Sequence, residues 1–169
     1  MDNPTTTKSQ NQSKEISSGD AYLKLQLDRQ TPAVLPIECA QEVLVLPSRR
    51  IAPMPNMPQS ILGLLNQRSR IFWVVDLPQL LQLSNVPIRA QNYHIAILQV
   101  DNDALGLVVE QIKGTIRFTK EQIQSSQGTV PSHLTPYLRG CIPQDNEILL
   151  VLEPKAILNC SHLHANKET

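Results

Sequence analysis

The chain has 169 residues, of which 41% are hydrophobic, and this is enough to bury the core of one compact domain, or of two small subdomains, without a metal or disulfide staple. Its 15 Lys and Arg residues balance its 15 Asp and Glu residues, so no basic excess directs the protein to nucleic acid or to an anionic membrane surface. No apolar stretch approaches the roughly 20 residues that span a bilayer, and the amino terminus lacks a signal-peptide core, so we expect a cytoplasmic protein without direct membrane insertion.

The two ends of the chain differ in composition from the rest. Residues 1–19 carry almost no apolar side chains and are rich in Ser, Thr, Asn, Gln and Lys. Such a segment cannot bury enough surface to offset the entropy of ordering, which predicts a disordered amino-terminal tail. Residues 160–169 resemble it and are predicted to be a carboxy-terminal tail. We therefore expect one folded domain over 20–159.

The first part of this body consists of short segments with strand-like patterns. Strict alternation of leucines over 23–28 predicts a half-buried strand. After a turn at 29–32, the β-prone runs 33–37 and 42–46 predict two more strands. Residues 53–58 contain three prolines, which exclude a helix interior or a central strand and favour an extended connector. This connector is either a stiff loop or a prearranged docking edge.

Residues 61–77 predict a hairpin of two strands with its turn at 67–70. The continuous apolar run 72–75 is typical of a strand that is buried on both faces. We therefore predict that Trp73 is largely buried. The alternative is that Trp73 faces a partner, because Trp is enriched at the centres of interfaces.

The second half of the body continues with the same kinds of signal. Its predicted elements are a hairpin over 93–110, a strand over 112–118, a helical turn capped by Thr119, a loop over 124–136, a hairpin over 138–152 and a closing helix over 153–158; a further helical turn begins at Pro78. The total is about nine or ten short strands without βαβ alternation. The sequence thus predicts an all-β fold, a sandwich or a pair of barrels, with the first and last strands of the body near each other.

Motifs that would carry catalysis or cofactor binding are absent from the sequence. None of the six glycines pairs with another in a phosphate-cradling loop, and there is no GxSxG or HExxH motif. Residues 160–164, CSHLH, hold three metal-ligand side chains, but a closed zinc site needs four and no second cluster supplies the fourth. His94 and His133 are isolated from any general-base constellation. We predict a protein without catalytic residues, cofactor or metal, and with reduced thiols.

Several motifs follow one another in a specific order. They are Gln41-Glu42-Val43, Pro55-Asn56-Met57-Pro58, the run ILGLLNQR over 61–68, Val74-Val75-Asp76-Leu77 and Gly106-Leu107-Val108-Val109-Glu110. This series resembles the CheW-like domain family, and the resemblance covers about 20–159. The chain departs from the family pattern where Ser69 replaces a turn glycine and Trp73 replaces a proline. The run 71–78 is similar to coupling proteins of pilus-based twitching motility or phototaxis systems.

The resemblance implies a fold, a function and partners. The fold is two small, intertwined five-stranded β-barrel subdomains packed side by side, with short helical turns. The function is that of a non-enzymatic chemotaxis adaptor. One surface would bind the regulatory domain of a CheA-type histidine kinase, and a groove between the barrels would bind the cytoplasmic tip of a methyl-accepting chemoreceptor. Such a protein would be cytoplasmic and associated with receptor arrays at the membrane.

The resemblance also assigns residues to the receptor-binding groove, but none to the kinase-binding surface. Ile37, Ala40 and Gly63 match apolar and small groove positions. Glu42 and Arg68 match an acidic residue and an arginine that could form an ion pair there. The alternative function is a small ligand-binding β-barrel unrelated to taxis, or an enzyme with an unrecognised site. A ligand-binding barrel would be expected to hold an apolar pocket with a few polar groups.

Overall fold

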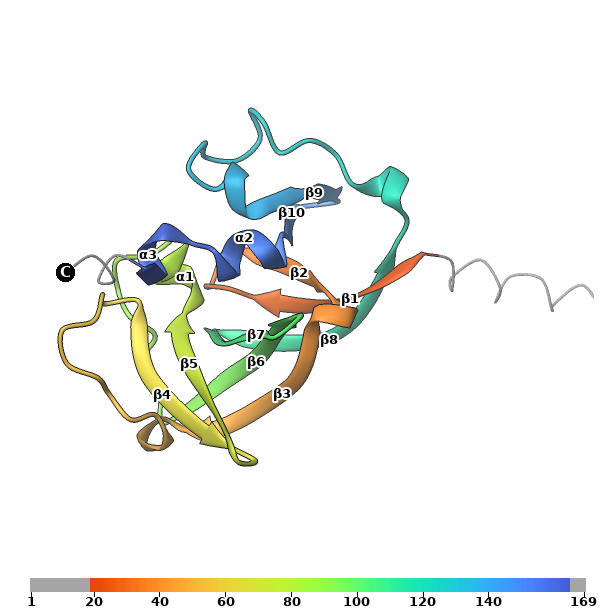
Figure 1. Ribbon diagram of the computed structural model, residues 1–169. Coiled ribbons are helices and arrows are strands. Elements are labelled where there is room, and N and C mark those ends of the chain that lie inside the picture. Colours follow the sequence, from red (N-terminus) through yellow and green to blue (C-terminus); the bar gives the residue numbers. More distant parts are fainter. Residues whose placement is uncertain (1–18, 165–169) are drawn as a thin grey trace, which may run out of the picture.

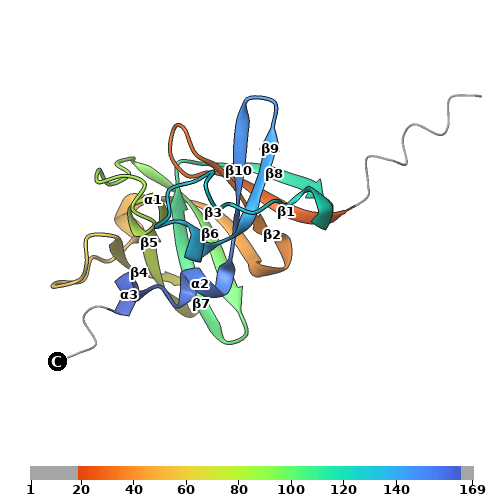
Figure 2. The same cartoon turned by 90° about the horizontal axis from the view of Figure 1, so that it is seen from above.

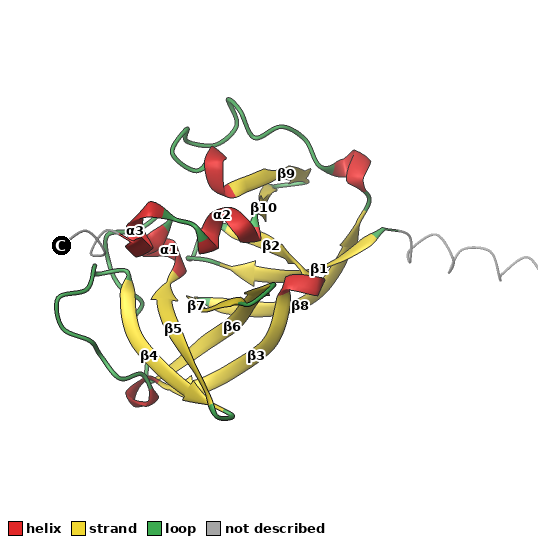
Figure 3. Ribbon diagram, viewed as in Figure 1, coloured by secondary structure: helices red, strands yellow, loops and turns green. Residues whose placement is uncertain are grey.

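The computed structural model describes residues 19–164, so most of the predicted amino-terminal tail and residues 165–169 lie outside the described residues. Within them the chain consists mainly of β-strands (Figures 1 and 3). The strands are β1 (Asp20–Gln26), β2 (Pro32–Pro36), β3 (Ala40–Pro47), β4 (Ile61–Gln67), β5 (Arg70–Asp76), β6 (Asn92–Val100), β7 (Asp103–Val109), β8 (Gln111–Phe118), β9 (Leu138–Gln144) and β10 (Glu147–Leu152).

The helical elements are short and lie between or after the strands. They are η2 (Ile37–Cys39), η3 (Ser48–Arg50), α1 (Leu77–Leu80), η4 (Lys120–Gln122), η5 (Thr135–Tyr137), α2 (Pro154–Leu158) and α3 (Ser161–His164). The predicted turns at Pro78 and Thr119 and the predicted closing helix are confirmed. None of the helices between residues 19 and 164 combines the length and the hydropathy needed to cross a bilayer.

The strands form two mixed sheets of five strands each. The sheet that we call barrel 1 has the order β8-β1-β2-β10-β9, and the sheet that we call barrel 2 has the order β3-β6-β7-β5-β4. All neighbouring strands are antiparallel except β2–β10 in barrel 1 and β5–β7 in barrel 2. The predicted all-β class with two five-stranded subdomains is confirmed. The first and last strands, β1 and β10, lie on either side of β2.

Each sheet is closed by a short backbone bridge between its two edges. In barrel 2, Ala52 and Leu64 exchange two hydrogen bonds with N–O distances of 2.8 and 2.9 Å, and in barrel 1 Gln124 and Cys141 exchange two of the same lengths. A glycine with positive φ precedes the bridged residue of β4 and β9. A Cβ atom added at Gly63 would lie 2.1 Å from the Ala52 carbonyl oxygen, and one added at Gly140 would lie 2.3 Å from the Gln124 carbonyl oxygen. Both barrels therefore close only where the approaching strand carries a glycine.

The two barrels share one strand pattern because the chain is built of two structural repeats. Strands β1 to β5 correspond in order and pairing to β6 to β10. The β1–β2 hairpin of the first repeat completes the barrel formed by β8, β9 and β10, and the β6–β7 hairpin completes the barrel formed by β3, β4 and β5. Figures 1 and 2 show this exchange as red-orange strands beside blue ones. The barrels are therefore intertwined, and neither is a continuous piece of chain.

Three clusters of buried side chains hold this arrangement together. Barrel 2 is filled by a cluster that includes Phe72, Val74 and Ile95, and barrel 1 by a cluster that includes Val34 and Leu149. The third and largest cluster takes side chains from strands of both barrels and from α1 and α2. The largest core thus lies between the barrels and belongs to both.

The burial of β5 differs from the sequence prediction. Phe72 and Val74 point into barrel 2 and are 5% and 0% exposed, whereas Ile71 and Trp73 point outward and are 69% and 39% exposed. The prediction that Trp73 is largely buried is wrong. The reason is that no element in the described part of the chain fully covers the outer face of β5 at Trp73, so residues 71–74 alternate, whereas Val75 is 0% exposed and lies in the core between the barrels.

The folded body continues beyond its predicted end at residue 159. Cys160 is 2% exposed within the central core, and Leu163 of α3 packs against the same core. The Cys160 thiol and the Tyr137 hydroxyl are hydrogen-bonded to each other, with an S–O distance of 3.4 Å. This bond and burial raise the pKa of Tyr137 to about 12. The last helical turn thus belongs to the folded domain rather than to the tail.

Candidate functional site

The turn between β4 and β5 is the most unusual local structure on barrel 2. Gln67 and Arg70 form the last strand pair, so Arg68 and Ser69 make a two-residue hairpin turn. Their φ angles are 51° and 64°. Two left-handed residues define a type I′ turn, in which Asn-Gly is the preferred sequence. This chain keeps the left-handed backbone at Ser69, although the glycine of the family pattern is missing.

Arg68 extends from this turn to the beginning of β3. Its Nη2 atom lies 3.3 Å from Oε1 of Glu42, so the predicted ion pair forms. The side chain of Arg68 is 78% exposed and that of Glu42 is 24% exposed. An exposed pair of this kind contributes about 0–1 kcal/mol to folding, which leaves both charges available to a partner.

Other predicted groove residues lie on the same segment as Glu42. Ile37 begins η2 and is 38% exposed, and Ala40 begins β3 and is half-buried. Gly63 stands apart from this group. It is buried in β4 beneath the Ala52 carbonyl, so its environment indicates a role in closing barrel 2 rather than in lining a groove that a partner reaches.

Two exposed valines on β3 were missed by sequence reasoning. Val43 is 46% exposed and Val45 is 59% exposed, and they lie one and three residues after Glu42 on the strand. The alternation of 41–46 contained this signal, but it does not say which face of the strand is covered. Because side chains alternate along a strand, the two valines lie on the face of β3 opposite to that of Glu42, and with Ile37 they add exposed apolar side chains to this segment.

A second exposed apolar surface surrounds Trp73. It is a groove of about 590 Å³ whose apolar lining includes Met57, Ile61, Ile71, Trp73, Leu105, Leu158 and Leu163. Arg70 borders the same groove. The groove joins the proline-rich connector to the outer face of β5 and to the helices that follow β10.

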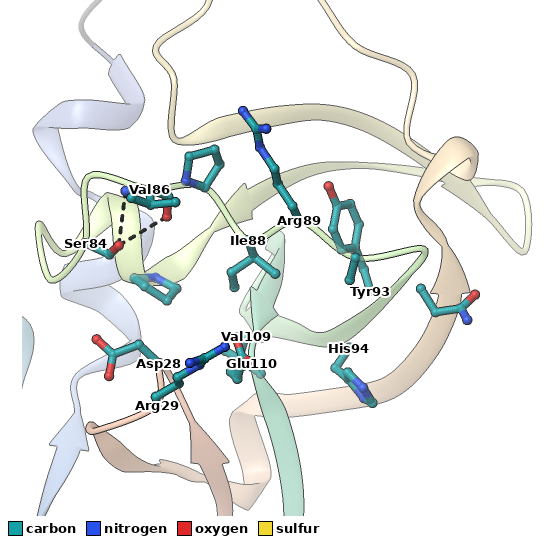
Figure 4. Close-up of a pocket in the computed structure, with 14 residues that line it drawn as sticks. Asp28, Arg29, Ser84, Val86, Ile88, Arg89, Tyr93, His94, Val109 and Glu110 are labelled. Atoms are coloured by element: carbon teal, nitrogen blue, oxygen red, sulfur yellow. Dashed lines mark hydrogen bonds between the residues drawn. The ribbon is translucent and has the colours of Figure 1, made fainter.

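A third hollow, of about 560 Å³, has a different character (Figure 4). It lies where the β1–β2 loop, the segment before β6 and the end of β7 meet, and charged side chains of both signs line it. They are Asp28, Arg29, Arg89 and Glu110. Ser84, at its rim, is hydrogen-bonded to the backbone of Val86. The view shows no nucleophile paired with a base among the residues drawn.

A buried carboxylate anchors the segment that forms one wall of this hollow. Asp76 is 0% exposed and accepts hydrogen bonds from the backbone N–H groups of Gln79, at 3.1 Å, and Ile88, at 2.7 Å. Burial raises the pKa of Asp76, and the two backbone bonds oppose that shift. Asp76 therefore caps the amino-terminal end of α1 and also holds the loop between α1 and β6 through Ile88.

The described residues contain no group of three or more His, Cys, Asp and Glu side chains placed to hold a metal ion. The predicted absence of a metal site at 160–164 concerned His162 and His164 as well, and their side chains lie outside the described part of the chain. The barrel interiors are filled by their own side chains. The enclosed pocket expected of a small ligand-binding barrel is therefore not provided by either interior.

Comparisons with known proteins agree with this architecture. The family model described as the CheW-like domain matches residues 21–161. The chemotaxis protein CheW of Treponema pallidum is 23% identical over 116 residues, which are 67% of this chain and 68% of that protein. The probable chemotaxis protein CheW of Rhizobium etli is 24% identical over 106 residues, which are 63% of this chain and 68% of that protein.

A solved structure extends the likeness to the fold. The scaffolding protein TtCheW of Thermoanaerobacter tengcongensis matches with a TM-score of 0.69 at 20% sequence identity, and the match covers 80% of this chain and 90% of that chain. The family model spans all ten strands apart from the first residue of β1, as well as the turn that carries Arg68. The chain belongs to the CheW-like domain family.

Proposed function

We propose that this protein is a non-enzymatic signalling adaptor that couples a methyl-accepting chemoreceptor to a CheA-type histidine kinase. The observation that carries the proposal is the exposed Arg68–Glu42 pair on a barrel with a filled interior, with the exposed Ile37 on the segment that leads into the strand of Glu42. Membership of the CheW-like family and the names of the two chemotaxis relatives support it.

The ion pair and the apolar residues that precede it on the chain suit the helical hairpin tip of a receptor. A polar residue of the receptor helix can contact Arg68 or Glu42, while its apolar face packs on Ile37 and Ala40, which the family resemblance assigns to the groove. Arginine favours such a role because its planar guanidinium holds an acceptor in a fixed geometry. Exposed charges at the edge of an apolar contact contribute mainly to orientation and specificity.

A coupling protein needs a second surface for its second partner. The groove around Trp73 offers an exposed aromatic side chain with apolar surroundings, and Trp is enriched among the residues that dominate binding energies. We assign this groove to the regulatory domain of the kinase. The adaptor then acts by holding both partners on one rigid body at the cytoplasmic side of a receptor array.

The motility system is proposed from the run 71–78, which resembles coupling proteins of twitching motility and phototaxis. Pull-down with each CheA-type kinase of the source organism tests this branch. Selective capture of the kinase of a pilus system supports it, and selective capture of a flagellar kinase contradicts it.

Binary binding experiments test the assignment of the two surfaces. Arg68→Ala is expected to weaken binding of a receptor-tip fragment by about tenfold, which corresponds to 1.4 kcal/mol, and to leave binding of the kinase regulatory domain unchanged. Trp73→Ala is expected to do the reverse. Lys24→Ala, which removes an ion pair with Glu147 in barrel 1, is the control and should alter neither affinity.

A charge exchange provides an internal check on the Arg68–Glu42 pair. The double variant Glu42→Arg with Arg68→Glu should recover part of the affinity that either single variant loses, if the pair acts as a unit. Receptor affinity that remains unchanged in both single variants would refute the receptor-binding role of this site.

A further inference from the structure

We propose that Arg70 is a positioning residue, which holds the β4–β5 turn in the geometry that places Arg68 beside Glu42. The inference rests on the proposed receptor-binding role of that pair. Arg70 does not belong to the motifs that carry the family resemblance, and its side chain reaches across barrel 2 to two other strands.

The contacts of Arg70 form a fork. Its Nη1 atom donates to Oε1 of Gln41 at 3.1 Å, and its Nη2 atom donates to Oε1 of Gln99, also at 3.1 Å. Its guanidinium carbon lies 4.9 Å from the centre of the Phe72 ring. Gln41 lies on β3 and Gln99 on β6, whereas Arg70 begins β5. One guanidinium therefore connects three strands at the same end of the barrel.

This connection is placed where the backbone provides little support. In the sheet order β3-β6-β7-β5-β4, the β4–β5 hairpin and β3 are at opposite edges. The bridge that closes these edges joins Ala52 to Leu64, several residues before the turn. Beyond that bridge, the hairpin is held by side chains: Arg50 donates to the Asn66 carbonyl at 3.3 Å, and at the turn itself Arg68 pairs with Glu42 and Arg70 bonds to Gln41.

The turn itself needs such support because its backbone is strained. Arg68 and Ser69 both have positive φ, and neither is glycine. Residues held in this conformation persist where the surrounding structure fixes them. Arg70 is the next residue after the turn, and Gln41 is the residue before Glu42. The Arg70–Gln41 bond therefore links residues that lie two positions after Arg68 and one position before Glu42.

A planar fork explains why this residue is arginine. Two acceptors on different strands can be engaged together by two N–H groups in one plane, and a lysine ammonium cannot reproduce that geometry. Arg70→Lys is thus expected to behave like Arg70→Ala. If charge alone were important, lysine would restore the wild-type behaviour.

The proposal is tested by combining binding with a measurement of turn mobility. Arg70→Ala should lower the affinity for a receptor-tip fragment about fivefold to tenfold, which is the size of effect expected when one interaction between neighbouring residues is lost. In the Arg68→Ala background, Arg70→Ala should cause no further loss. The NMR order parameters of the amides of Arg68 and Ser69 should fall in Arg70→Ala and Arg70→Lys. Arg117→Ala, which removes an exposed arginine bond to the Gly19 carbonyl in barrel 1, should change none of these quantities.

The possible results separate this inference from the proposed function. Additive losses in the double variant would show that Arg70 contacts the receptor itself, and unchanged order parameters would show that it does not hold the turn; either result overturns the inference. If Arg68→Ala leaves receptor affinity intact, the proposed site is wrong, and the order parameters alone then decide whether Arg70 positions the turn.

Discussion

At the scale of single residues, the proposed receptor-binding surface depends on a turn whose backbone is unfavourable for its sequence. Ser69 has a φ of 64° without being glycine. Replacing it by glycine removes the steric cost of the left-handed conformation and increases the entropy of the unfolded chain, two effects of opposite sign. We expect Ser69→Gly to raise the free energy of unfolding by up to about 1 kcal/mol in urea titrations. Ser69→Ala, which retains a Cβ atom, should give no such gain, and equal effects of the two substitutions would contradict a strained turn.

The residues of this site were only partly predictable from the sequence. Glu42 and Arg68 were identified through a motif series, and their ion pair is confirmed. The bonds of Arg70 to Gln41 and Gln99 were not predicted, because both partners are 29 residues away in the sequence and no local pattern marks them. Contacts of this kind depend on how the sheet edges meet.

At the scale of elements, the closure of each barrel depends on one glycine. Gly63→Ala and Gly140→Ala place a Cβ atom against a backbone carbonyl that is itself part of the closing bridge. We expect each substitution to lower the free energy of unfolding by about 3 kcal/mol or more, because both the clash and the positive φ oppose it. Gly128→Ala is the control, since Gly128 also has positive φ but nothing lies within 4 Å of its added Cβ. If Gly63→Ala and Gly140→Ala lower the free energy of unfolding no more than Gly128→Ala does, barrel closure does not require a glycine at the bridge.

The strands themselves were predictable because their signals are local. Alternating side chains and turn residues identified the two hairpins whose turns were predicted at 101–103 and 144–146, as well as the strand β8. The exposed face of β5 was not predictable, because an apolar run does not reveal whether another element covers it, and Trp73 was assigned to the core for that reason. The repeat was also hidden, since only scattered matches such as Gly63 with Gly140 and Ile71 with Ile148 remain in the sequence.

At the scale of the whole molecule, the exchange of hairpins predicts cooperative unfolding. Each barrel contains strands from both repeats, and the largest core belongs to both barrels. Trp73 fluorescence reports on barrel 2, and far-UV circular dichroism reports on all strands. We expect one transition with the same midpoint for both probes. Leu149→Ala, in the core of barrel 1, should lower that midpoint equally for both, with a loss of about 2–5 kcal/mol. A Trp73 transition that stays unchanged in this variant would show that the barrels unfold independently.

The protein is proposed to join a receptor to a kinase through two surfaces, and a three-component recruitment experiment tests this role most directly. Receptor-tip fragments displayed on liposomes are mixed with the CheA-type kinase and with the protein, and the kinase that sediments with the liposomes is measured. The wild-type protein should bring the kinase to the liposomes, whereas Arg68→Ala should bind the kinase and leave it in solution. Recruitment of the kinase to the same extent without the protein, or with Arg68→Ala in its place, would contradict the claim.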